Sequence, residues 1–189
     1  MVDTLLSFSH LAVLVPSVEK AAGVLREHGF KTGPAEVFEG EGTREIYVGD
    51  YETQSALLLL MEPAREDSSY GRALKKRGPG IHHIAVDVLN IEEYVKNISG
   101  SGWFLHMNSL HTLKHMNTVY LARPLMPTMI EVQQHEKISK LPSLVNEVVL
   151  PLDEAQEKIM NAVGVHSVCA GKEISFNLNQ KKFKLSDLL

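Results

Sequence analysis

The sequence contains a single cysteine, Cys169, among its 189 residues. One cysteine excludes an intrachain disulfide and any metal site built from several thiolates, and it fits a reducing cytoplasm. The chain also lacks an excess of positive charge, since its formal net charge is −4. Its densest basic run, residues 75–77, is too short to follow a phosphate backbone. We therefore expect no nucleic-acid partner.

Long apolar runs are missing as well. The longest, residues 56–61, is far too short to cross a bilayer. Asp3 stands where a signal peptide would carry positive charge. We therefore expect a cytoplasmic protein with no membrane partner. A hydrophobic content of 44% with 22% charged residues is typical of a chain that buries a sizeable core.

What the chain does contain is an internal repeat. The segment "SHLAVLVPSVEKA", which starts at Ser9, matches "HHIAVDVLNIEEY", which starts at His82. The register is kept across a strand, a helix and the glycine that ends the helix, which indicates duplication of a supersecondary unit. The matching pairs are His10 with His83, Ala12 with Ala85, Val13 with Val86, Val15 with Val88, Glu19 with Glu92, Leu25 with Ile98, Gly29 with Gly102 and Phe30 with Trp103.

Each copy predicts the same order of elements. A strand is followed by a helix that begins after Ser17 or Asn90, and three further apolar segments complete the copy. The predicted strands are 9–15, 30–38, 44–48 and 55–62 in the first copy and 81–88, 103–107, 117–122 and 128–133 in the second. The sequence thus predicts an α+β fold with two β-α-β-β-β modules, at about 8–63 and 80–135, in a domain of residues 1–136.

The remaining residues, 137–189, have no counterpart in the repeat. Their pattern predicts a helix over 153–163 and short strands over 173–178 and 181–185, separated by a polar turn. We expect a C-terminal α/β extension. The sequence leaves open whether it packs on the core or on a second subunit.

The repeat distinguishes two adjacent histidines, His82 and His83. Because neighbouring side chains of a strand point to opposite faces, at most one of them is expected to serve an interior site. The repeat selects His83, since it is the counterpart of His10. A single buried histidine is more often a hydrogen-bonded core residue, but two at equivalent strand positions favour a metal site.

A third candidate ligand is Glu131, a lone acid inside an apolar strand, where an ionised carboxylate is expensive to bury unless a cation or donors meet it. Two histidines and one carboxylate suit a single divalent ion, Zn, Ni, Co, Mn or Fe. Small residues two along from each histidine, Ala12 and Ala85, leave room for an ion or a ligand. We expect the metal ligands to be His10, His83 and Glu131.

The segments "SHLAVLVPSVEKA", "GPGIHHIAVDV" and "RPLMPTMIEVQQ" resemble the vicinal oxygen chelate superfamily, whose members include glyoxalase I, methylmalonyl-CoA epimerase, extradiol dioxygenases and bleomycin-resistance proteins. The segments "GTREIYVG" and "LLLLMEP" are most similar to the epimerase and glyoxalase branch. The resemblance implies paired modules that form an open mixed β-barrel around a metal. It agrees that the histidine before "IA" is a ligand, and it implies a possible homodimer.

The sequence departs from this branch at the fourth ligand, a Glu or Gln that the last strand of the first module usually supplies. Alignment on the terminal "EP" puts Leu59 at that position, and the repeat offset puts Leu58 there. Neither leucine is a ligand.

Glyoxalase and epimerase chemistry needs a second proton-transferring group besides Glu131. Glu41 is our candidate, with Glu39 and Glu45 as alternatives; all three are also consistent with a solvated loop and strand face.

The implied function is a divalent-metal-dependent lyase or isomerase that acts on a small oxo-compound or acyl-thioester through an enolate. The alternatives are an Fe(II) extradiol-type dioxygenase, which uses two histidines and one glutamate, and a ligand-sequestering binding protein without catalysis. The expected partner is a small-molecule substrate. Its candidate contacts are Arg44, Tyr47, His106 and Arg123; His111 and His115 are expected on an exposed loop.

Overall fold

The computed structural model describes residues 6–189, so residues 1–5, with Asp3, lie outside the described part. The elements of the first half, in chain order, are β1 (Leu6–Leu14), α1 (Val18–Glu27), β2 (Glu36–Phe38), β3 (Thr43–Val48), β4 (Leu57–Pro63) and α2 (Ser69–Arg77). Those of the second half are β5 (Gly80–Val88), α3 (Ile91–Asn97), β6 (Phe104–Leu105), α4 (Ser109–Met116), β7 (Thr118–Ala122) and β8 (Met129–Gln134).

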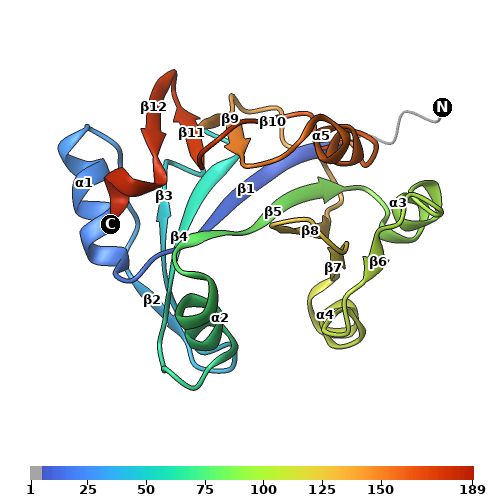
Figure 1. Cartoon of the computed structure of the whole chain (residues 1–189), viewed down its shortest axis with the longest axis horizontal. Helices are drawn as coiled ribbons and strands as arrows, with labels where there is room; N and C mark the ends of the chain where they lie inside the picture. Colours follow the sequence, from blue (N-terminus) through green and yellow to red (C-terminus); the bar gives the residue numbers. More distant parts are fainter. Residues whose placement is uncertain (1–5) are drawn as a thin grey trace.

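These strands form one mixed sheet of eight strands in the order β2-β3-β4-β1-β5-β8-β7-β6. The two modules meet where β1 pairs antiparallel with β5, and each module then continues outward in the same way, through a parallel neighbour and an antiparallel one. In Figure 1 both ends of the sheet descend from the central pair β1 and β5, with α2 and α4 below it. The sheet is therefore an open arch with a pseudo-two-fold axis between β1 and β5.

The repeated helices α1 and α3 begin as the sequence predicts. The side chain of Ser17 accepts a hydrogen bond from the backbone N–H of Lys20, and that of Asn90 accepts one from Glu93, which satisfies donors that a helix start leaves free. Both helices bury an apolar stripe in the cluster that contains Leu11 of β1. We call the face of the sheet that carries Leu11 the outer face.

The opposite, inner face carries a smaller apolar cluster of Ala12, Leu14, Leu59 and Met61. Helix α2 packs on it through Tyr70, Ala73 and Leu74. Helices α2 and α4 are not predicted from the sequence, because each is short and amphipathic over barely two turns. His111 and His115, expected on a loop, lie on α4.

The C-terminal extension forms β9 (Val145–Leu150), α5 (Glu154–Asn161), β10 (Val168–Ala170), β11 (Ser175–Leu178), β12 (Lys181–Lys184) and a closing 3₁₀ turn (Leu185–Leu188). Its strands make a second sheet in the order β10-β9-β11-β12. Its buried residues join the outer-face cluster, and Tyr94 of α3 donates a hydrogen bond to the carbonyl of Val163 at 2.7 Å. The extension thus packs on the core of its own chain.

Among residues 6–189, no helix has the length and apolar character needed to cross a membrane.

Candidate metal centre

Strand register brings the three candidate ligands onto one face. In the β1–β5 pair His10 lies opposite Ala85 and Ala12 lies opposite His83, while Glu131 of β8 lies beside Ala85. Directly paired residues project to the same side of a sheet. His10, His83 and Glu131 therefore share the inner face of three adjacent strands, next to the axis that relates the modules.

The ligand atoms of these three side chains converge. The two histidine Nε2 atoms are 3.0 Å apart. Oε2 of Glu131 is 3.3 Å from Nε2 of His10 and 3.0 Å from Nε2 of His83. Ligands at right angles around an ion about 2.1 Å away lie about 3 Å from each other. The donor set therefore fits one divalent ion held on one side by two imidazoles and a carboxylate, and this group is the candidate metal site among the described residues.

All three candidate ligand side chains are almost fully buried, and their surroundings shift the pKa of His83 and of Glu131. The exposed fractions are 5% for His10, 3% for His83 and 5% for Glu131. Burial lowers the pKa of His83, which favours the neutral imidazole that binds metals. Burial raises the pKa of Glu131, but its short polar contacts with Nε2 of His10 and Nε2 of His83 outweigh this effect and leave the pKa well below its usual range. The centre therefore holds an ionised carboxylate.

Neighbouring polar groups fix the orientation of that carboxylate. Its other oxygen, Oε1, accepts hydrogen bonds from the Tyr120 hydroxyl at 3.0 Å and from Nε2 of Gln133 at 3.3 Å. Gln133 in turn accepts one from the Ser9 hydroxyl at 3.2 Å. With Oε1 held in this way, Oε2 is left to face the two histidines.

The repeat extends to the rings around the centre. Tyr120 meets His83 edge-to-face at 5.9 Å between ring centroids, and Tyr47, its counterpart in the first module, meets His10 in the same way at 6.0 Å. The symmetry fails at the fourth ligand. Tyr120 pairs with Glu131 across strands, but Tyr47 pairs with Leu59. Register therefore makes Leu59, not Leu58, the counterpart of Glu131.

The expectation that only one of His82 and His83 can face the interior is wrong. His83 pairs with Ala12, yet Ile81 pairs with Val13, so His82 is the extra residue of a β-bulge. A bulge interrupts the alternation of side chains. Nδ1 of His82 lies 2.8 Å from Nδ1 of His83 as a result. Burial lowers the pKa of His82 to about 3, so the ring is neutral.

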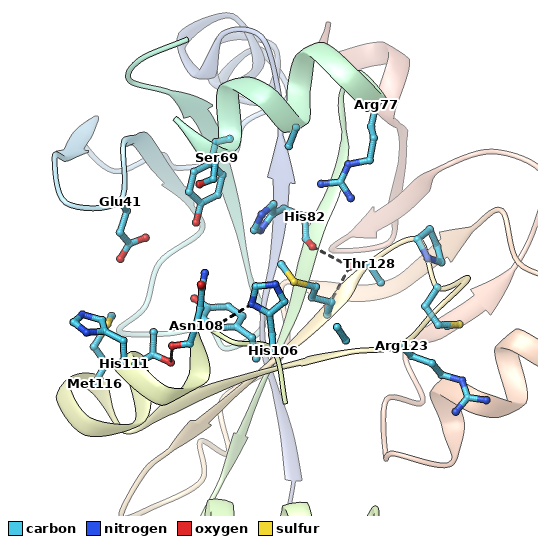
Figure 2. Close-up of a pocket in the computed structure, with 18 of the residues that line it drawn as sticks. Glu41, Ser69, Arg77, His82, His106, Asn108, His111, Met116, Arg123 and Thr128 are labelled. Carbon is cyan, nitrogen blue, oxygen red and sulfur yellow. Dashed lines mark hydrogen bonds between the residues drawn. The ribbon is translucent and has the colours of Figure 1, made fainter. Parts of the chain in front are cut away.

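A cavity of about 750 Å³ opens beside the centre. Figure 2 shows its lining side chains, with His82 and Arg77 on one side and His106, Asn108 and His111 across from them. Tyr120, which holds Glu131, also lines it. Its volume is in the range of small-molecule binding sites, and Tyr120 links its wall to the candidate metal centre.

A second cavity, of about 610 Å³, is lined by Glu45 and Tyr47 on the first module's side of the centre. Glu45 is only 8% exposed and accepts a hydrogen bond from the Thr43 hydroxyl at 2.8 Å. Burial raises its pKa. Of the three glutamates that are also consistent with a solvated face, Glu45 is thus buried on the inner face, because it alternates with Arg44 on β3.

Glu41 lies at the rim of the first cavity. Its enclosure there, with a smaller contribution from the charge of Glu131, raises its pKa. Glu39 has an 80% exposed side chain and pairs loosely with Arg65. The structure therefore brings Glu41 and Glu45, but not Glu39, toward the centre.

The proposed substrate contacts divide into two groups. His106 lines the first cavity and Tyr47 lines the second. Arg123 lies at the far edge of the first one, where its guanidinium donates to the Ser101 carbonyl. Arg44 does not reach the inner face; it pairs with Glu19 and Glu62 at 2.9 and 3.0 Å, because β3 directs it toward α1. We therefore no longer place Arg44 among the substrate contacts.

Comparison with known proteins gives a fold but no close relative. No protein-family description and no curated protein matches the chain. Among solved structures, a hypothetical protein from Bacillus halodurans is similar, with a TM-score of 0.58, 21% identity, and coverage of 71% of this chain and 98% of that one.

Methylmalonyl-CoA epimerases are similar too. The epimerase from Mycobacterium tuberculosis has a TM-score of 0.54 and 21% identity over 71% of this chain and 93% of its own. An epimerase solved in complex with methylmalonyl-CoA and NH₄⁺ has a TM-score of 0.52 and 22% identity over 74% and 99%. The chain therefore has the fold of these epimerases, and the predicted α+β fold of paired β-α-β-β-β modules is confirmed.

Proposed function

We propose that the chain is a divalent-metal-dependent isomerase or lyase that acts on a small oxo-compound or an acyl-thioester, with His10, His83 and Glu131 as metal ligands. The observation that carries the proposal is the convergence of three buried ligand atoms, from both modules, within 3.0 to 3.3 Å of one another. A divalent ion in this place would act as a Lewis acid that stabilises negative charge on a substrate oxygen.

Proton transfer falls to the glutamates. The Oε2 edge of Glu131 faces the centre, and Glu45 and Glu41 face it from the first module's side and from the cavity rim. The raised pKa of Glu45 and of Glu41 lets either carboxyl carry a proton closer to neutral pH than an ordinary glutamate. We propose that Glu45 and Glu41 supply the base and the acid that an enolate reaction at a stereocentre requires, and that Glu131, whose low pKa makes it a weak base, serves as a metal ligand.

The cavity favours a substrate with a polar or anionic part. Arg77, His82, His106 and His111 place donors around it, while Met126 and Met129 give it apolar surface. An acyl-thioester has both characters. The solved neighbour that binds methylmalonyl-CoA supports the choice of this class, and a hemithioacetal of methylglyoxal and glutathione is the corresponding oxo-compound.

Elemental analysis of the purified protein, followed by reloading with Zn²⁺, Ni²⁺, Co²⁺, Mn²⁺ or Fe²⁺, tests the metal centre. We expect one equivalent per chain, lost in His83→Ala and Glu131→Gln and retained in His166→Ala, which removes an exposed histidine of the extension. Wild-type protein that takes up no stoichiometric ion would refute the proposal.

The chemistry is tested by incorporation of deuterium from D₂O at the α-carbon of methylmalonyl-CoA, followed by NMR, and by turnover of the methylglyoxal–glutathione adduct. Incorporation with any loaded metal supports an enolate. A loaded protein that does neither, but cleaves a catechol with Fe²⁺ and dioxygen, would favour the oxygenase instead. The three-ligand set, with Leu59 in the fourth place, is the specific feature that keeps this second candidate in view.

A further inference from the structure

Each module carries a β-bulge one residue before its candidate metal-binding histidine. In β1 the extra residue is Ser9, since Phe8 pairs with Val86 and His10 pairs with Ala85. In β5 it is His82, by the register described above. Ser9 and His82 are also counterparts in the repeat. The two bulges are therefore one structural feature of the duplicated unit, but it holds different side chains in the two copies.

The side chain of His82, at the bulge of β5, contacts the candidate metal ligand His83. The 2.8 Å separation between Nδ1 of His82 and Nδ1 of His83 is a hydrogen bond in which one ring donates and the other accepts. Nε2 of His83 is directed at His10 and Glu131. A neutral imidazole has one N–H and one lone pair. If the lone pair of His83 is on Nε2, its Nδ1 carries the hydrogen and His82 is the acceptor.

The His82 ring is itself held in place. It lies against the Tyr70 ring of α2, with 4.8 Å between centroids and 36° between planes. The hydroxyl of Thr128, on the segment before β8, donates a hydrogen bond to the backbone carbonyl of His82 at 3.3 Å. The bulge, α2 and β8 thus fix both the backbone and the side chain that accepts from His83.

We propose that His82 is a positioning residue of the metal centre: its Nδ1 accepts a hydrogen bond from Nδ1–H of His83 and so holds the His83 ring with its Nε2 lone pair toward the ion. This inference rests on the proposed metal site. The bulge residue of the first module, Ser9, does not contact its neighbouring histidine in this way. Its hydroxyl donates to Gln133, which in turn donates to Oε1 of Glu131.

Two substitutions separate the hydrogen bond from the packing. His82→Phe keeps a ring against Tyr70 but offers no acceptor, whereas His82→Asn offers an amide oxygen close to the position of Nδ1. We expect Zn²⁺ affinity, measured by competition with a chromophoric chelator, to fall about 10- to 100-fold in His82→Phe, as is typical for loss of an outer partner of a metal-binding histidine. In His82→Asn we expect most of that affinity to return.

Imidazole ¹⁵N NMR of Zn²⁺-loaded wild-type protein gives a readout that needs no variant and no activity. We expect His83 to be protonated at Nδ1 and metal-bound at Nε2. Protonation at Nε2, or binding through Nδ1, would overturn the inference, and so would wild-type affinity in a folded His82→Phe. If the wild-type protein bound no Zn²⁺, the proposed metal centre would fail and this inference with it, whereas an intact centre with an indifferent His82 would remove the inference alone.

Discussion

At the scale of single residues, Leu59 limits the candidate metal centre to three potential protein ligands among the described residues. Its side chain is 3% exposed and lies on the inner face in the place that Glu131 occupies in the second module. An aliphatic group there contributes to the cluster with Ala12 and Met61, and it leaves one side of the centre without a protein ligand.

Replacing Leu59 with Glu tests this reading. Without metal, we expect Leu59→Glu to lower the free energy of unfolding by about 3–5 kcal/mol, because it buries a carboxylate that has no partner. Added Zn²⁺ should recover most of that loss, since the new carboxylate faces the centre. Chemical denaturation with and without Zn²⁺ measures both effects.

Leu58→Glu is the matched control. Leu58 is equally buried but belongs to the outer-face cluster. Its loss of stability should not respond to Zn²⁺. Equal recovery in the two variants would contradict the assignment of Leu59 to the ligand position.

At the scale of elements, α2 is a part of the candidate site that lies outside the two repeated modules. It connects the two modules, covers the inner-face cluster and brings Tyr70 and Arg77 to the cavity. Its first turn is tight: the side chain of Ser68 accepts from the backbone N–H of Gly71 at 3.0 Å. Because Gly71 has no side chain, the backbone of Arg65 and Glu66, which precedes the helix, can pack directly against its first turn.

Gly71→Ala should therefore destabilise the protein. A Cβ at this position would lie 2.3 Å from the carbonyl oxygen of Glu66, a backbone atom that cannot move aside without shifting the turn. In an ordinary helix the same change stabilises by about 1 kcal/mol. We expect the opposite sign, together with weaker Zn²⁺ binding if α2 supports His82 as inferred.

Gly23→Ala in α1 supplies the comparison, and urea unfolding measures the stability of both variants. The nearest atom to its added Cβ is the flexible end of Arg26 at 4.0 Å, so the usual stabilisation should appear. A Gly71→Ala protein as stable as the Gly23→Ala protein would show that the turn before α2 yields easily.

At the scale of the whole molecule, the extension completes the outer face. Phe183 of β12 meets Phe30 and His28 edge-to-face, with 5.7 and 5.2 Å between ring centroids. The segment just before β4 is also hydrogen-bonded to the extension: the backbone N–H of Ser55 donates to the carbonyl of Pro142 at 2.9 Å. Buried residues of both parts form one apolar cluster.

Because the two parts share a core, we expect residues 6–136 and 137–189 to unfold together. Calorimetry of the full chain should give one transition whose calorimetric enthalpy equals its van't Hoff enthalpy. A chain that ends at residue 136 should lose most of its stability, since the apolar outer face would be left in water. Two separate transitions would show instead that the extension folds independently.

The repeat predicted the order of the strands in each module and the helices α1 and α3, but not α2 or α4. A fixed offset between two amphipathic patterns predicts two equal modules, and a fold that pairs them brings equivalent positions to one axis. His10 and His83 lie together for that reason, and the pairing of β5 with β8 adds Glu131, although the role of all three as metal ligands stays a prediction. The caps at Ser17 and Asn90 were equally local, because a capping side chain binds within its own first turn.

Only the tertiary structure decided the features that depend on pairing between distant strands. The bulge that turns His82 toward His83 is defined against β1, and Leu59 is matched to Glu131 by the neighbours of each strand. The burial of Glu45 and the packing of α2 on the inner face likewise depend on residues that are distant in the chain. A local pattern carries alternation and periodicity, but register and burial are properties of the assembled sheet.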